Sequence, residues 1–288
     1  MKVFEAFAGY GSQHLALKRL NCDFEIVGIS EIDKYALTAY EALHGSLPTN
    51  YGDISKIDWD TVPDFDLFTY SFPCQDISIV GQRKGFDEGS GTESSLLWEC
   101  KRAIEAKKPA ILLMENVKNL VGKKNKPNFD KWCEYLESLG YKNYWKVLNA
   151  KDYGIPQNRE RVFMLSFLDD RDYVFPEPKE CRTLADVGIS APIIHFAFGE
   201  KREYYDYSPT LTRATGGGHI PSSNGQQLTP YQCSRLMGLT DEEANRLCSS
   251  GLSRTRLYGC LGNSIVVDVL EKLLEEVCPS GKQTKKSH

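Results

Sequence analysis

The chain has 288 residues, 41% of them hydrophobic, which is enough for one sizeable core and a smaller appended domain. No apolar run approaches the roughly 18 residues that a membrane span requires, and a strand pattern begins at Lys2, so we expect neither a membrane anchor nor a signal peptide. The net charge of −4 gives no overall basic character, but local clusters of lysine and arginine leave nucleic-acid binding open.

The nine cysteines are scattered along the chain, and no two have CxxC spacing. The odd count and irregular spacing argue against a disulfide framework and against a zinc site. We therefore expect a reducing, intracellular compartment and no metal. All cysteines except Cys74 are expected to be packed free thiols.

Short apolar strands alternate with amphipathic helices over the first two thirds of the chain. Strands are predicted over residues 2–7, 24–30, 65–71, 110–116, 144–150 and 161–167. Helices are predicted over residues 12–20, 33–45, 94–108 and 128–140. This alternation predicts an α/β fold with a largely parallel sheet that is covered by helices on both faces.

The pattern changes after Leu168. Residues 169–180 are charged and contain two prolines, as in a linker, and residues 180–228 have no clear period. Helices are predicted to start near Thr229, to cover 241–250, and to close the fold over 264–278. The polar tail, residues 279–288, is expected to be disordered.

Two glycines follow the first predicted strand in the segment FAGYGS and permit a tight turn that a ligand can approach closely. Glu31 lies at the end of the second predicted strand, where nucleotide-binding α/β folds place a carboxylate that binds ribose hydroxyls. Gly9 and Gly11 complete only GxG, not the phosphate-binding motif GxGxxG. A ligand with a ribose and no phosphate, such as S-adenosylmethionine, fits this pattern, with Asp53 placed to accept from an adenine amino group.

Cys74 follows an apolar strand and a proline in the segment SFPCQD. Free cysteines are usually buried, but polar residues follow this one, so we interpret Cys74 as a nucleophile whose thiolate is the reactive form. Glu115 stands at the carboxyl end of another predicted strand, where α/β sheets gather catalytic groups, although a capping carboxylate would look the same. Gln157, Arg159 and Arg161 alternate, which predicts one strand face that clamps an anion, or else a solvated edge.

In order and spacing, these motifs resemble the cytosine-5 DNA methyltransferases of the compact bacterial and phage type. The resemblance runs nearly from end to end of the chain. It rests on FAGYGS (7–12), EID (31–33), GD (52–53), FPCQDIS (72–78), ENV (115–117), QNRER (157–161), TLTRATGGG (210–218), RLMGL (235–239) and GNSIVVDVL (262–270).

The resemblance implies a Rossmann-like S-adenosylmethionine-dependent methyltransferase sheet with a small, irregular target-recognition domain. The catalytic and cofactor-binding domain would cover residues 1–170, completed by a C-terminal helix over 258–278, and the shortened recognition domain would cover 171–257. The implied reaction transfers a methyl group from S-adenosylmethionine to carbon 5 of a cytosine flipped out of double-stranded DNA, at a short specific sequence.

Residue roles are also implied by the resemblance. Cys74 would attack carbon 6 of the cytosine, Glu115 would contact ring nitrogen 3 and the exocyclic amine, and Arg159 and Arg161 would steady both. Cofactor contacts are implied for Phe7, Gly9, Gly11, Glu31, Ile32, Asp53, Leu96, Asn263 and Ser264. Substrate contacts are implied for Gln75, Ser78, Arg83, Lys84, Gln157, Thr210 and Arg213.

The sequence departs from the family pattern at Ser12, where a glycine is usual, and at Asp76 and Ile77, which replace a small residue and an aromatic one. The stretch between QNRER and TLTRATGGG is short, which favours a short recognition sequence or reduced affinity for DNA.

Three alternatives remain at this point. The family's tRNA-directed branch shares the motif order, but its Cys-Phe-Thr signature is absent from this sequence. A non-catalytic regulator on the same scaffold would not need both Cys74 and Glu115. A nicotinamide-dependent oxidoreductase would leave PCQ, ENV and QNRER unexplained.

We further expect a monomer that acts in the cytoplasm of a bacterial or phage-infected cell. Its partner is double-stranded DNA, and no membrane partner is expected. A cognate restriction endonuclease that acts on the same site, without stable association, is the other expected partner.

Overall fold

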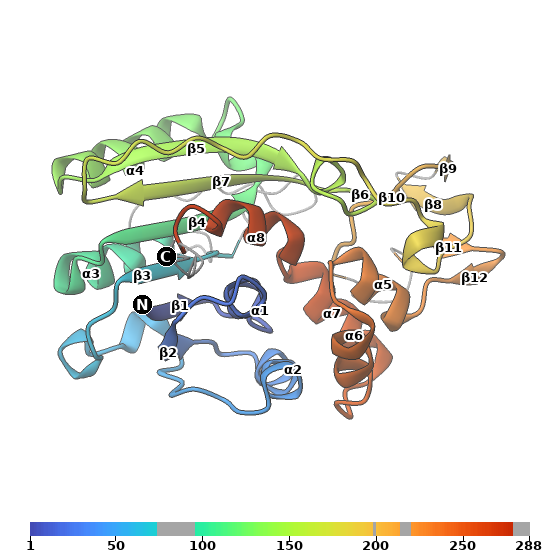
Figure 1. Cartoon of the computed structure of the whole chain (residues 1–288), viewed down its shortest axis with the longest axis horizontal. Helices are drawn as coiled ribbons and strands as arrows, with labels where there is room; N and C mark the ends of the chain where they lie inside the picture. The colour runs from blue at the N-terminus through green and yellow to red at the C-terminus, as the bar shows by residue number, and fades with distance from the viewer. Residues whose placement is uncertain (74–95, 198–199, 214–219, 279–288) are drawn as a thin grey trace, which may run out of the picture.

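The computed structural model describes residues 1–73, 96–197, 200–213 and 220–278. A six-stranded sheet forms its centre (Figure 1). In order across the sheet the strands are β2 (Glu25–Ser30), β1 (Lys2–Ala6), β3 (Leu67–Tyr70), β4 (Ile111–Val117), β7 (Glu160–Phe167) and β5 (Lys142–Asn149). The first four are parallel, whereas β7 runs antiparallel to both β4 and β5. The predicted α/β fold with a mostly parallel sheet is confirmed.

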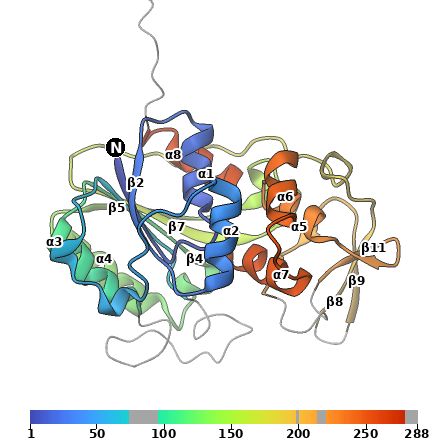
Figure 2. The ribbon, with the colours of Figure 1, turned by 90° about the horizontal axis from the view of Figure 1, so that it is seen from below.

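Helices cover both faces of this sheet (Figure 2). One face carries α1 (Ser12–Arg19), α2 (Lys34–His44) and α8 (Val267–Leu274), and the other carries α3 (Leu97–Lys107) and α4 (Lys126–Ser138). Neighbouring residues of each strand divide between the two faces, because side chains alternate along a strand. On β1, for example, Val3 packs in the core that includes α1 and α8, and Phe4 packs in the core that includes α3.

Local sequence signals fix several helix ends. Asp33 caps α2 by accepting a hydrogen bond from the N–H of Tyr35 at 2.9 Å, and Gly45 ends that helix in a left-handed conformation. The helix predicted near Thr229 is α5 (Pro230–Leu236), and Thr229 and Gln232 form a capping box at its start. These boundaries follow the sequence expectations closely.

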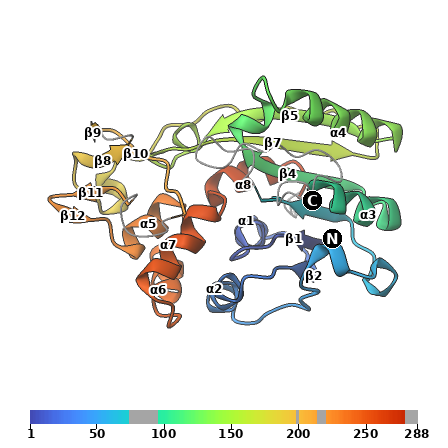
Figure 3. The same ribbon diagram turned by 180° about the vertical axis from the view of Figure 1, so that it is seen from behind.

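Residues 193–263 build a second region beside the large sheet (Figure 3). Its strands are β8 (Ile193–Ala197), β9 (Glu200–Tyr204), β11 (Ser222–Ser223) and β12 (Gln226–Gln227), which form one small sheet. It also contains α5, α6 (Asp241–Cys248) and α7 (Arg254–Asn263). The small sheet was not predicted. The single closing helix expected over 258–278 is wrong, because the chain forms two helices there, α7 and the shorter α8, with a break at residues 264–266.

Two short strands join the two regions. β6 (Gln157–Asn158), just before β7, pairs in parallel with β10 (Ser208–Pro209). This pairing holds the segment that follows β9 of the small sheet against the segment that precedes β7 of the large sheet.

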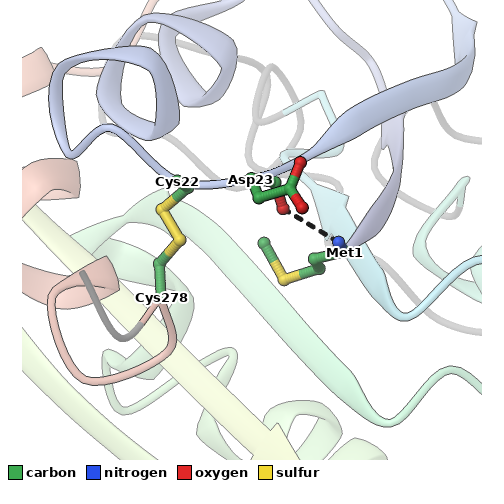
Figure 4. The surroundings of a disulfide bond; sticks show 4 residues. All are labelled: Met1, Cys22, Asp23 and Cys278. Carbon is green, nitrogen blue, oxygen red and sulfur yellow. Dashed lines mark hydrogen bonds between the residues drawn. A yellow bond between two sulfur atoms is a disulfide. The ribbon is translucent and has the colours of Figure 1, made fainter. Parts of the chain in front are cut away.

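A disulfide joins Cys22, which follows α1, to Cys278, which follows α8 (Figure 4). The expectation that these two cysteines are free thiols is therefore wrong. The two cysteines can bond because α1 and α8 pack side by side, which brings their Cα atoms within 5.9 Å of each other. Beside them, the N-terminal amine of Met1 donates a hydrogen bond to the carbonyl of Asp23 at 2.9 Å.

Within the described ranges, no helix has the length and apolar character needed to cross a bilayer. The same part of the chain holds no group of three or more histidine, cysteine, aspartate or glutamate side chains arranged for a metal ion. The tail predicted to be disordered, 279–288, lies outside the described residues.

Candidate functional site

The carboxyl ends of the parallel strands meet at one edge of the large sheet. The chain leaves β1 at Phe7, β2 at Glu31 and β3 at Ser71, while Glu115 lies near the end of β4. Because parallel neighbours end at the same edge, these four segments lie next to one another in the order β2-β1-β3-β4. Phe7 and Glu115 are 108 positions apart in the sequence, yet both lie at this edge of the sheet.

Three residues of the loop between β1 and α1 have the left-handed backbone conformation. Phe7, Gly9 and Gly11 have positive φ angles of 57°, 58° and 76°. The carboxylate of Glu31 accepts hydrogen bonds from the N–H of Gly9 at 2.9 Å and of Asp33 at 2.8 Å. Burial raises the pKa of Glu31, and the hydrogen bonds from these two N–H groups oppose that rise. The glycine loop and the carboxylate of Glu31, both predicted from the sequence to bind a cofactor, are therefore in direct contact.

Other residues predicted to bind a cofactor surround this loop. Ile32, directly after Glu31, is apolar and yet 76% exposed. Asp53 follows Gly52, whose carbonyl accepts a hydrogen bond from Ser30 on β2 at 2.7 Å. The Asp53 carboxylate caps the next turn, accepting from the N–H of Ser55 at 3.0 Å and from its hydroxyl at 2.8 Å, and these bonds lower the pKa of Asp53.

The junction between α7 and α8 closes the same side of the loop. Ser264 is buried, and its Oγ lies 3.8 Å from the point where a side chain at Gly9 would begin. Its neighbour Asn263 is exposed. Leu96, directly before α3, packs half-buried against the core that Phe7 also contacts. Eight of the nine predicted cofactor residues thus lie in segments next to the carboxyl ends of β1 and β2 or at the junction before α8, and Leu96 lies beside α3.

Glu115 and Arg161 form a buried ion pair. Glu115 is 7% exposed, and its Oε1 lies 3.2 Å from Nε of Arg161. In the antiparallel ladder of β4 and β7, Arg161 is the partner of Val117, so it lies diagonally across from Glu115 on the same face. Burial raises the pKa of Glu115, and the charges of Arg161 and Arg159 oppose that rise.

Asn116 fastens the segment that leads to the predicted nucleophile. Its side-chain amide donates a hydrogen bond at 2.9 Å to the carbonyl of Phe72, which is buried. The chain is thereby tied to β4 two residues before Cys74, beside Glu115. Sequence reasoning assigned Asn116 no role, although its place directly after Glu115 in ENV was a signal. Other predicted residues lie outside the described ranges: Cys74, Gln75, Ser78, Arg83 and Lys84.

Arg159 has different surroundings from Arg161. The expectation of one continuous strand through both is wrong, because β6 ends at Asn158 and β7 begins at Glu160. The guanidinium of Arg159 is buried and donates to three backbone carbonyls, those of Leu211 at 2.7 Å, Gly262 at 3.0 Å and Ser264 at 2.6 Å.

This arginine therefore ties two distant segments together. At the same place, a Cβ on Gly262 would lie 2.4 Å from the backbone of Thr212, so only glycine permits the close approach. The segment around Thr212 is thus held against the junction that carries Ser264.

The three remaining predicted substrate residues are placed differently from one another. Gln157 is fully buried. Its side-chain Nε2 donates to the carbonyl of Leu236 at 2.7 Å, and its Oε1 accepts from the N–H of Leu211 at 3.0 Å. Thr210 is half-buried and donates to the carbonyl of Asn158 at 2.6 Å. Arg213 alone of the three is exposed.

Residues 1–203 match the family model for C-5 cytosine-specific DNA methylase, which is more than half of the chain. The chain belongs to this family. As a member of the C-5 cytosine-specific DNA methylases, it is an enzyme that methylates DNA cytosine at carbon 5. The resemblance recognised from the motifs is confirmed.

Relatives in this family align with almost the whole chain. The chain is 40% identical to the type II methyltransferase M2.ScrFI of Lactococcus lactis subsp. cremoris, over 97% of this chain and 99% of that protein. It is 31% identical to the type II methyltransferase M.HhaI of Haemophilus parahaemolyticus, over 94% and 92% of the two chains. It is 29% identical to the orphan methyltransferase M.SssI of Spiroplasma monobiae, over 96% and 97%.

The fold is shared with solved structures of low sequence identity. The Dnmt2 methyltransferase of S. pombe superimposes with a TM-score of 0.74 at 22% identity, over 96% of this chain and 99% of that one. The Entamoeba histolytica methyltransferase EhMeth gives a TM-score of 0.76 at 18% identity, over 96% and 97%. These similarities confirm the Rossmann-like methyltransferase fold of this C-5 cytosine-specific DNA methylase.

Proposed function

We propose that this enzyme transfers a methyl group from S-adenosylmethionine to carbon 5 of a cytosine flipped out of double-stranded DNA, through a transient bond from Cys74 to carbon 6. The observation that carries the proposal is the buried Glu115, paired with Arg161 at 3.2 Å. It stands beside the strand whose continuation, at Pro73, leads directly to the cysteine.

The residues around the glycine loop fit the cofactor. Glu31 presents a carboxylate at the end of β2, where a ribose diol can donate to it, and exposed Ile32 offers an apolar surface to an adenine ring. Phe7, Gly9, Gly11, Asp53 and Leu96 would line the remainder of this site, with Asn263 and Ser264 at its far side. When bound there, S-adenosylmethionine supplies a methyl group on a positively charged sulfur.

The side chains activate the cytosine by addition and elimination. The Cys74 thiolate bonds to carbon 6, and the electron pair of the 5,6 double bond then makes carbon 5 nucleophilic. Glu115 contacts ring nitrogen 3 and the exocyclic amine, so a proton on its carboxyl group can stabilise the negative charge that develops in the ring. After carbon 5 has gained the methyl group, a base removes its proton, the double bond re-forms and the thiolate leaves.

Arg161 holds Glu115 in place, because the diagonal arrangement on β4 and β7 fixes both side chains on one face. Burial raises the pKa of Glu115, which favours the protonated carboxyl group that could donate a hydrogen bond to the ring. Arg159 acts at a distance from the cytosine, by positioning Ser264 and the segment that contains Leu211.

DNA contacts are proposed for residues on two segments. Gln75, Ser78, Arg83 and Lys84 follow the nucleophile in sequence, and Thr210 and Arg213 follow β10. We leave Gln157 out of this set because its amide is buried and bonded within the protein. The recognition domain is proposed to span 171–257, and the catalytic domain 1–170 with 258–278.

The setting of the enzyme is also a proposal. We infer that it acts as a monomer on DNA in the cytoplasm of a bacterial or phage-infected cell. A restriction endonuclease that cleaves the same sequence would be its functional partner, with no stable complex between the two proteins. The type II relatives support this pairing, and the orphan relative supports a solitary enzyme.

The decisive test compares wild type with Cys74→Ser in single-turnover methyl transfer to duplex DNA and to tRNA. Wild type is expected to methylate DNA and not tRNA. The variant is expected to lose transfer while it retains S-adenosylmethionine affinity in calorimetry. Methyl transfer to tRNA and not to DNA would show that the substrate is RNA. If Cys74→Ser lost both cofactor binding and activity, Cys74 would have a structural role instead of a catalytic one. Bisulfite sequencing of DNA from expressing cells then gives the sequence context.

A further inference from the structure

The loop between β1 and α1 requires support from its surroundings. Phe7 is not glycine and has a φ of 57°, a conformation that costs free energy unless neighbouring groups hold it. Glu31 supports the loop from the β2 side through the N–H of Gly9. A second support is present on the opposite side, and the proposed function assigns no task to it.

His44, the last residue of α2, provides that second support. Its Nε2 lies 3.0 Å from the carbonyl oxygen of Tyr10, so the imidazole donates a hydrogen bond to the loop between its two glycines. The ring also packs tightly against the next residue, because a Cβ on Gly11 would lie 2.6 Å from Nε2 of His44 and 2.6 Å from the ring of Tyr40.

A buried group of side chains holds His44 in turn. The imidazoles of His14 and His44 stack, with ring centroids 3.9 Å apart and planes inclined by 15°. Nδ1 of His14 lies 2.9 Å from the hydroxyl of Tyr40, which donates to Oε2 of Glu5 at 2.9 Å. The other carboxylate oxygen of Glu5 accepts from the backbone N–H of His14 at 3.0 Å. Strand β1 and helices α1 and α2 are thereby joined behind the loop.

Burial keeps both imidazoles neutral. It lowers the pKa of His14 to about 4 and that of His44 to about 3. A neutral imidazole carries one N–H, and in His44 the contact with a carbonyl places that N–H on Nε2. The stacked rings therefore do not repel each other at neutral pH.

We propose that His44 is a positioning residue for cofactor binding, which sets the loop conformation through the Tyr10 carbonyl and is itself fixed by His14, Tyr40 and Glu5. This inference rests on the proposed function, because it assumes that the loop binds S-adenosylmethionine. Loss of the His44 hydrogen bond would let the loop relax from the conformation that presents Gly9 beside Glu31. Binding of the cofactor would weaken, whereas the chemistry at Cys74 and Glu115 would be preserved once the cofactor is bound.

The test measures the dissociation constant of S-adenosylmethionine by calorimetry without DNA, and KM and kcat separately. His44→Leu is expected to raise the dissociation constant and KM roughly tenfold and to leave kcat within about twofold. His44→Gln, whose amide N–H can reach the same carbonyl, is expected to restore most of the affinity. Glu41→Gln, an exposed position on the same helix, is the matched control and is expected to change neither value.

Two results would overturn the inference: a His44→Leu dissociation constant within twofold of wild type, or a His44→Gln value as weak as that of His44→Leu. If His44→Leu does not fold, Tyr40→Phe decides, because it removes the hydroxyl between Glu5 and His14 and retains the ring. It should then weaken binding several-fold, and unchanged binding would contradict the inference. Wild type that binds no S-adenosylmethionine would instead refute the proposed function.

Discussion

Glu31 and Glu115 are carboxylates at the carboxyl ends of strands in one sheet, and burial raises the pKa of both. They are nevertheless held differently. Glu31 accepts from two backbone N–H groups, which cannot move without the loop itself. Glu115 is paired with the side chain of Arg161, which lies on the neighbouring strand. This difference fits the proposed division of tasks, in which Glu31 shapes the cofactor site and Glu115 exchanges a proton with the cytosine.

The largest expected effect comes from Glu115→Gln, which removes the proton donor and retains the shape of the side chain. We expect kcat to fall by about 10² to 10⁴, or about 3–5 kcal/mol, with unchanged S-adenosylmethionine affinity. Single-turnover methylation and calorimetry measure the two quantities. Glu160→Gln is the control, because that carboxylate pairs with Lys118 at 2.8 Å on the exposed side. A Glu115→Gln enzyme with the kcat of wild type would contradict the proposed role of Glu115 as a proton donor.

Glu5 sharpens the comparison because it is fully buried and, among the residues that the structure describes, pairs with no cation; it also has no proposed ligand. Burial raises its pKa from 4.5 to about 7. The folded state therefore keeps this proton where the unfolded state has lost it, and the stability that Glu5 contributes is complete below pH 4.5 and is lost as the pH rises to 7.

Glu5→Gln should abolish that part of the pH dependence, which amounts to roughly 3 kcal/mol. The measurement is urea unfolding of wild type and variant between pH 4.5 and pH 8. The difference in unfolding free energy between the two proteins should change across this range and level off above pH 7. A constant difference would show that Glu5 is ionised throughout.

Glu31→Gln is expected to have the smallest effect. The glutamine side chain has one acceptor oxygen fewer for the ribose hydroxyls. Its NH₂ group would also face a backbone N–H, which is a donor as well. The dissociation constant for S-adenosylmethionine should therefore rise 10- to 100-fold, or about 1–3 kcal/mol. At saturating cofactor, kcat should stay within a few-fold of wild type. A large fall in kcat at saturation would mean that Glu31 and Glu115 do not divide their tasks as proposed.

Much of the large sheet could be predicted from sequence because its signals are local. Strand and helix alternation placed β1 to β5 and α1 to α4 within a few residues. The small sheet lacked such a signal, since β9 reads EKREY without apolar alternation. The bounds of α7 were missed because glycines at 259 and 262 interrupt its apolar pattern, although Gly262 permits a close backbone approach.

Contacts between distant segments explain most of the remaining differences. Cys22 and Cys278 are separated by 256 positions, and only the packing of α1 on α8 brings them together. The regular spacing of Arg159 and Arg161 suggested one shared face, but a break between β6 and β7 directs Arg159 to backbone carbonyls of two other segments. The place of Glu115 near the carboxyl end of β4 was predictable, because it directly follows a local run of apolar residues.

The most direct test of the account uses duplex DNA in which 5-fluorocytosine replaces the target cytosine identified by bisulfite sequencing. Fluorine at carbon 5 prevents the final proton loss, so the enzyme with S-adenosylmethionine should form an adduct that survives denaturing electrophoresis. Peptide mass mapping should place the DNA on Cys74, and Cys74→Ser should give no adduct. Absence of the adduct from an enzyme that methylates the ordinary duplex, or attachment at another cysteine, would contradict the proposed mechanism.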